Sequence, residues 1–232
     1  MGDLSKYTAI PDLMNAWAHD FQNDIHIFIP DGIVCESEYA RPHVLFVMRD
    51  MNVQDKHDLC ADLRNSSSGW KTWNNAARWL VALLDGDGVY PRNIDRCTQM
   101  RKAAVLNIKK EAGGSRAFKK ELEEAAKMYG QYIKRENELC DPDIIICGGF
   151  GNAGILMDYV FQEDAGPWQE ITSVNFSRTW WYYFASISGK KVPVISFCHP
   201  QVTHFEGKRG HTDLFEPLYR EMLNFRNIFL MN

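Results

Sequence analysis

Four short apolar runs spread along the chain constrain its fold more than any other feature. They span residues 43–48, 103–108, 143–147 and 192–197, and β-branched residues are common in them. Apolar and polar residues do not alternate strictly within these runs. Such a pattern is typical of strands that are covered on both faces, as in parallel sheets. We therefore expect four buried strands.

Helical patterns lie between these runs. Apolar residues recur at helical spacing in residues 72–84 and 116–139, and residues 11–21 also read as a helix. An aromatic block at residues 176–184 is expected to form a further helix that packs on the sheet. Strands that alternate with helices favour parallel pairing through right-handed crossovers.

No repeat or linker divides the sequence, so we expect a single domain of residues 1–232. The expected fold class is α/β, a three-layer α/β/α sandwich with a central four-stranded parallel sheet. The formal net charge is −4, so contact with nucleic acid would require a local basic patch rather than bulk charge.

The sequence also predicts where the protein works. It begins without the charged and apolar regions of a signal peptide, and its apolar runs are too short to cross a bilayer. Its six cysteines contain no C-x2-C pair, which disfavours zinc and iron–sulfur sites and suits a reducing compartment. We expect a cytoplasmic protein with no metal, no cofactor and no membrane partner.

Polar residues follow each expected strand. Arg49-Asp50-Met51-Asn52 follows the first, and Asn107 ends the second, ahead of Lys109 and Lys110. A Gly-Gly-Phe-Gly turn at residues 148–151 follows the third, and a His-Pro-Gln-Val-Thr-His stretch at residues 199–204 follows the fourth. Ligands of open parallel sheets bind at the carboxyl ends of the strands, so these residues predict one site.

The order of these blocks resembles the uracil-DNA glycosylase superfamily. Residues 48–52 resemble its G-Q-D-P-Y-like motif, and Val105-Leu106-Asn107 resembles the strand whose asparagine reads the base. Residues 199–204 resemble its H-P-S-P-L-S-like motif, and Arg209-Gly210-His211 with a helix at residues 214–223 resembles the segment that follows.

The resemblance implies roles for individual residues. Asp50 would stabilise the oxocarbenium-like sugar and position water, and His199 would donate to a carbonyl oxygen of the departing pyrimidine. Asn107 would read the Watson–Crick edge of a flipped base. DNA contacts would come from Lys109, Lys110, Lys208, Arg209, Thr203 and Phe205, and Trp70 is a candidate for stacking on a base.

Each role has a structural alternative. Asp50 also suits a helix cap, His199 a turn before proline, and Asn107 a bond between loops. Lysines in such loops are often solvated, and Trp70 would equally anchor its own loop.

The chain departs from the family pattern at several positions. Asn52 stands where uracil-specific enzymes carry a tyrosine that blocks a substituent on C5 of the base, and Met48 and Met51 replace glycine and proline. Thr203 replaces the leucine that wedges open the duplex, with Phe205 nearby as a substitute. The change at Asn52 favours a pocket for a 5-modified pyrimidine.

We therefore expect a monofunctional DNA glycosylase that flips out a pyrimidine, favours a 5-modified base and leaves an abasic site. Modified pyrimidines occur in some bacteriophage genomes, which leaves antiviral defence open as a role beside repair. The alternatives are a uracil-DNA repair glycosylase, a catalytically silent nucleic-acid-binding module with the same fold, and an unrelated nucleoside hydrolase or transferase.

Overall fold

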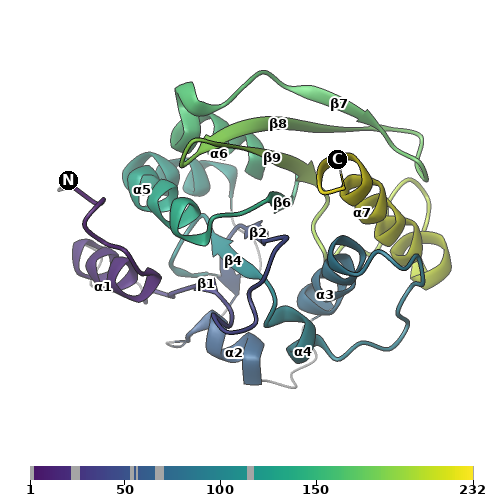
Figure 1. The fold of residues 1–232 in the computed structure, drawn as a ribbon, viewed down its shortest axis with the longest axis horizontal. Helices are drawn as coiled ribbons and strands as arrows, with labels where there is room; N and C mark the ends of the chain where they lie inside the picture. Colours follow the sequence, from purple (N-terminus) through teal and green to yellow (C-terminus); the bar gives the residue numbers. More distant parts are fainter. Residues whose placement is uncertain are drawn as a thin grey trace.

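A mixed sheet of seven strands forms the centre of the protein in a computed structural model, which describes residues 3–21, 27–52, 55, 57–65, 71–113 and 118–231 (Figure 1). The strand order is β1-β4-β2-β6-β9-β8-β7. The strands are β1 (Gly32–Ile33), β2 (Val44–Met48), β4 (Ala104–Asn107), β6 (Ile144–Gly148), β7 (Gln169–Thr172), β8 (Thr179–Ile187) and β9 (Lys190–Phe197).

The expected sheet of four parallel strands is wrong as a description of the whole. Strands β4, β2, β6 and β9 do pair in parallel as neighbours, but β1 adds to β4 in antiparallel orientation, and β8 and β7 extend the other side in antiparallel orientation. A separate two-stranded parallel sheet is formed by β3 (Met51–Asn52) and β5 (Ala112–Gly113).

The expected helix at residues 176–184 is also wrong, because most of this block forms β8. A tight turn at Ser188 and Gly189, with φ angles of 50° and 78°, joins β8 to β9 as a hairpin. Two successive positive φ angles give the backbone twist that two-residue hairpins favour. The rings of Trp180 and Tyr183 are buried on opposite faces of this strand, which suits a strand better than a one-sided helix.

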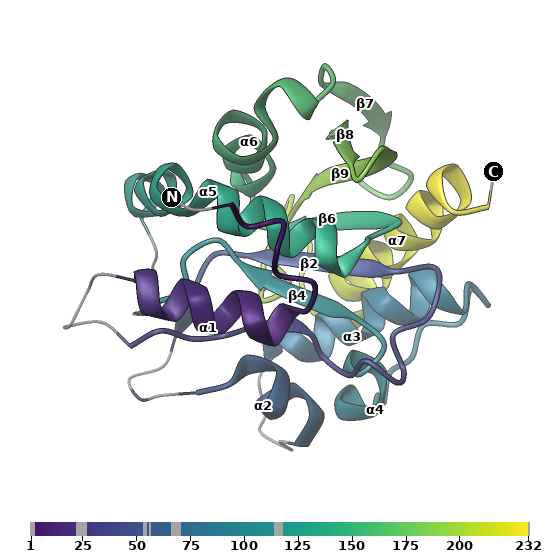
Figure 2. The same ribbon diagram turned by 60° about the vertical axis from the view of Figure 1, so that its left-hand side comes forward.

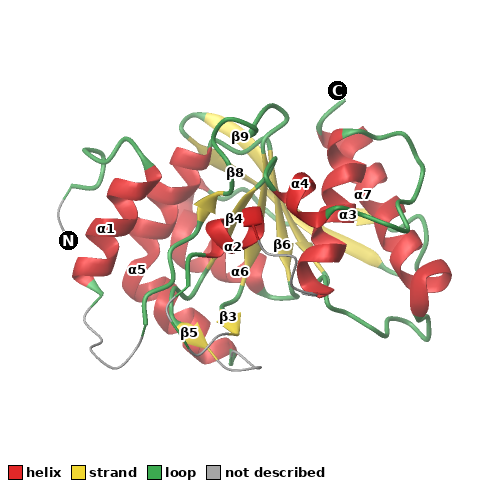
Figure 3. Ribbon diagram, turned by 90° about the horizontal axis from the view of Figure 1, so that it is seen from below, coloured by secondary structure: helices red, strands yellow, loops and turns green. Residues whose placement is uncertain are grey.

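Helices cover both faces of the sheet (Figures 2 and 3). The strand residues Phe46, Val105 and Ile146 pack towards α2 (Leu59–Asn65), α3 (Lys71–Leu84), α4 (Arg96–Met100) and α7 (Glu216–Phe229). The alternate residues Leu45, Leu106 and Ile145 pack towards α1 (Ile10–Asp20), α5 (Lys119–Cys140) and α6 (Asn152–Leu156). The full burial of strands β2, β4 and β6 follows from these two layers.

Sequence periodicity located the main helices. The expected helices at residues 11–21 and 72–84 are confirmed as α1 and α3, and the long helix expected from residue 116 is α5. Residues 114–117 lie outside the described part. Short π-helical turns at Met157–Phe161 and His211–Phe215 and a 3-10 turn at Gln162–Asp164 complete the helical segments. No helix among the described residues is both long enough and apolar enough to span a membrane.

Candidate active site

The carboxyl ends of β2, β4, β6 and β9 meet at one edge of the sheet. Met48 pairs with Asn107, and Gly148 pairs with Phe197. Hydrogen bonding continues one step past the strands, because the Lys109 N–H donates to the Arg49 carbonyl at 2.9 Å. The residues that follow β2 and β4 are therefore held in register with each other.

Asn107 is buried at this edge, with 2% of its surface exposed. Its backbone N–H donates to a carboxylate oxygen of Asp31 at 2.7 Å, which fixes the end of β4. Strand alternation places Asn107 on the face that Val105 and Met48 share with α3. The side-chain amide makes no hydrogen bond within the described part of the chain, so it is free to bind a ligand.

Asp50 is partly buried just after β2. Burial raises the pKa of its carboxyl group, and the positive charge of Lys109 opposes that rise. The alternative role as a helix cap does not fit, because α2 begins only at Leu59 and the Asp58 carboxylate accepts the Ala61 N–H at 2.9 Å there. A partly desolvated carboxylate next to a lysine suits the stabilisation of a cationic sugar.

His199 follows β9, and its imidazole has a defined protonation pattern. The Gln201 N–H donates to Nδ1 at 3.1 Å, so in the neutral ring the proton sits on Nε2. Burial, and to a lesser extent the charge of Arg49, lowers the pKa of His199 to about 4. The ring is therefore neutral at pH 7 and offers Nε2–H as a donor. The histidine holds its turn, and its Nε2–H has no hydrogen-bond partner in the described part of the chain.

Arg49 is a site residue that the sequence reasoning missed. Its charge adds to the lowering of the His199 pKa by burial and opposes the rise that burial causes in the Asp50 pKa, so the guanidinium lies within electrostatic reach of both side chains. Its Nε is buried and has no hydrogen-bond partner among the described residues. The signal in the sequence was an arginine at the glutamine position of the G-Q-D-P-Y-like motif.

The two lysines after β4 do not form a free basic surface. Lys109 pairs with Glu111 at 3.3 Å and with Glu121 at 3.5 Å. Lys110 is fully buried between Asp31 and Glu136, with its ammonium 2.8 Å from Glu136 Oε2. The expected DNA contact of Lys110 is therefore wrong, because its ammonium group is fully buried and forms ion pairs with two carboxylates.

An arginine inside an aromatic cluster lies beside the strand-end loops. The Arg178 guanidinium carbon lies 4.6 Å from the ring centres of Phe150 and Trp180 and 4.9 Å from that of Phe205. Phe150 follows β6 and is 46% exposed, and Phe205 lies in the loop after β9. This cluster was not predicted as a unit, and Phe205 is partly buried in it, stacked with Phe150 and Trp180.

The remaining predicted DNA contacts lie in the loop after His199. Thr203 and Arg209 are exposed. Lys208 donates to the Asn175 carbonyl at 2.7 Å and lies over the Phe176 ring, so its charge is partly engaged. Trp70 and the side chain of Asn52 lie outside the described residues, although the Asn52 backbone forms part of β3.

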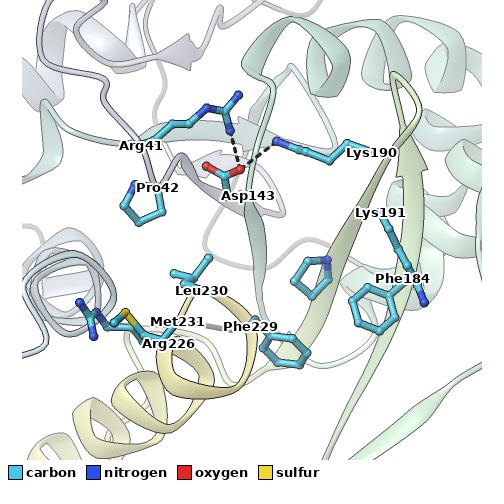
Figure 4. A pocket seen from close by; sticks show the side chains of 11 residues that line it. Arg41, Pro42, Asp143, Phe184, Lys190, Lys191, Arg226, Phe229, Leu230 and Met231 are labelled. Carbon is cyan, nitrogen blue, oxygen red and sulfur yellow. Dashed lines mark hydrogen bonds and ion pairs between the residues drawn. The ribbon is translucent and has the colours of Figure 1, made fainter.

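Two surface hollows lie away from this edge. One, of about 480 Å³, opens where β2, β6 and β9 begin, at the opposite end of the parallel strands (Figure 4). Its charged residues are largely paired, since Asp143 binds both Arg41 and Lys190. The other, of about 350 Å³, lies along β8 near Phe184. Neither contains Asp50, Asn107 or His199. Within the described residues, no three His, Cys, Asp or Glu side chains converge as metal ligands would.

Comparison with known proteins does not assign this chain to a family. No protein-family model matches the sequence, and no curated protein matches it. The resemblance to the uracil-DNA glycosylase superfamily therefore rests on the four blocks of residues quoted above.

Proposed function

We propose that this protein is a DNA glycosylase that hydrolyses the N-glycosidic bond of a flipped pyrimidine. The observation that carries the proposal is the neutral His199, with Nε2–H free to donate, on the same sheet edge as the partly buried Asp50 and the unengaged Asn107 amide. These three groups supply a donor to the base, a carboxylate to the sugar and an amide that can read the base edge.

The proposed reaction needs water and these side chains. The C1′–N1 bond breaks with its electron pair moving onto the base, while Asp50 stabilises the positive charge that develops on the sugar. A water oxygen then bonds to C1′ and gives up a proton, and the base takes a proton to leave as the neutral molecule. His199 donates to a carbonyl oxygen of the base while that base carries negative charge.

We propose a 5-modified pyrimidine as the substrate, with uracil as the alternative. The support is Asn52, which replaces the tyrosine that excludes C5 substituents in the uracil-specific enzymes that the sequence resembles. The same proposal places the protein in the cytoplasm and gives it a role in antiviral defence or in DNA repair.

The deciding experiment measures abasic-site formation. Single- and double-stranded oligonucleotides, each carrying one uracil, 5-hydroxymethyluracil or 5-hydroxymethylcytosine, are incubated with the protein and then cleaved with alkali. We expect cleavage at the 5-substituted base at a higher rate than at uracil. Faster cutting of uracil would favour the repair enzyme, and binding without cleavage on the whole panel would favour the silent module.

A variant tests the pocket directly. Asn52→Tyr should shift preference back towards uracil or abolish activity, because the ring would fill the space beside C5. An unchanged ratio of rates on uracil and on the 5-substituted base would show that Asn52 does not face the base.

A further inference from the structure

The strongest unassigned feature of the site is the side chain of Arg49. Among the described residues its buried Nε has no hydrogen-bond partner, and the guanidinium forms no ion pair with a carboxylate. An arginine side chain carries its positive charge at every pH at which proteins fold. A partly buried guanidinium with no ion-pair partner among the described residues suits an anionic ligand.

A second hydrogen-bond donor, the side-chain amide of Asn152, lies near Arg49. Gly149, with a φ of 128°, lies so close that a Cβ built there would be 3.3 Å from Arg49 Nε and 3.3 Å from Asn152 Nδ2. The Asn152 amide already donates to the Gly148 carbonyl at 3.2 Å, which orients its NH2 group. The absence of a side chain at residue 149 therefore leaves the arginine room beside a second donor.

A charge balance then points to a function. The departing base carries a full negative charge when the C1′–N1 bond breaks, whereas His199 is neutral and contributes a dipole but no charge. Arg49 acts electrostatically on His199 and is the cation at this position of the site. Asp50 bears the opposite charge and serves the sugar rather than the base.

We propose that Arg49 binds the base as it leaves in its anionic form and supplies the positive charge that the neutral histidine lacks. This inference rests on the proposed glycosylase activity. It adds the residue that stabilises the base as it leaves. The electron pair of the C1′–N1 bond moves into the pyrimidine ring, Arg49 stabilises that anion, and a proton from water completes the free base.

The test compares leaving groups in wild-type protein, Arg49→Gln and Arg49→Lys. The substrates are oligonucleotides with one uracil or one 5-fluorouracil. Arg49→Gln should slow excision of the less acidic base by roughly a hundred- to a thousand-fold, the usual effect of losing one preorganised electrostatic contact. The more acidic fluorinated base needs less help, so its loss should be several-fold smaller.

Controls separate this role from a structural one. Arg49→Lys keeps the charge and should recover part of the lost rate, and Arg220→Gln, an exposed arginine on α7 paired with Glu216, should leave both rates unchanged. Thermal unfolding of each variant shows that the fold is retained. If Arg49→Gln does not fold, the Arg49→Lys comparison decides the question, because displacing the charge should still slow the less acidic base more.

The outcomes are distinguishable. Equal losses on both bases, or no loss, would overturn the role of Arg49 while leaving the glycosylase proposal intact. A wild-type protein that cuts no member of the panel would overturn both.

Discussion

The backbone N–H of Gln201 donates to Nδ1 of His199 across 3.1 Å. This bond places the ring proton on Nε2 and makes the neutral imidazole the form that the folded protein prefers. Since the pKa of His199 is lowered to about 4, protonation would remove the acceptor of this bond and place a cation next to Arg49.

The first prediction concerns stability in acid. Between the ordinary histidine pKa of 6.5 and the folded value of about 4, the unfolded chain binds a proton at His199 that the folded protein does not. The free energy of unfolding should therefore fall as the pH decreases through this range. His199→Gln should lose less stability than wild type between pH 7 and pH 4.5, measured as the shift in urea midpoint. His19→Gln, at an exposed position, serves as the control, and equal shifts in wild type and His199→Gln would contradict the prediction.

The second prediction concerns the carboxylate. Asp50→Asn should lower the excision rate by roughly a hundred- to a thousand-fold, because the amide cannot stabilise a positive sugar. The urea midpoint should stay close to that of wild type, since no hydrogen bond to the Asp50 side chain is found in the described structure. Asp12→Asn on the exposed face of α1 is the matched control. A wild-type rate in Asp50→Asn would place the chemistry elsewhere.

The third prediction concerns the buried lysine. Lys110→Gln removes the cation that faces Asp31 and Glu136 in a fully buried cluster, where burial already raises the pKa of Glu136. Breaking such a cluster from one side costs about 3–5 kcal/mol of unfolding free energy. Lys109→Gln, whose partners are more exposed, should cost less than about 1 kcal/mol. Urea titration of both variants measures the two losses in unfolding free energy. Similar losses would show that the buried cluster stabilises the fold no more than the ion pairs of Lys109 do.

The fourth prediction concerns DNA affinity. Arg209 is exposed, and if it contacts a phosphate, Arg209→Ala should reduce the slope of log affinity against log salt by about 1. Phe205→Ala should weaken binding with little change in that slope, because stacking releases no counterions. Lys191→Ala, at the other end of β9, is the control. A slope unchanged in Arg209→Ala would remove this loop from the DNA-binding surface.

The sequence predicted the central strands because burial on both faces leaves a local pattern, as in Val44–Met48. Strand β8 was not predicted because the spacing of its aromatic residues does not distinguish a helix from a strand. The sequence signal for a strand was the Ser188-Gly189 turn that follows it. Lys110 was predicted to contact DNA from its position after a strand and from the family resemblance. Its two acidic partners lie 79 and 26 positions away in the chain, so the sequence gives no local sign of its burial. Arg49 shows the same limit, because an arginine in a loop reveals nothing of its burial until the neighbouring strands are in place.

The pairing of β2 determines at what stage of folding the candidate site forms. Its neighbours β4 and β6 come from distant parts of the chain, with Val44 aligned with Ile144. Pairings this remote in sequence form late and slowly, after the cost of closing long loops has been met. Residues 50, 107 and 199 reach their common edge only when all of these strands are seated. An incompletely folded molecule would therefore lack the candidate site altogether.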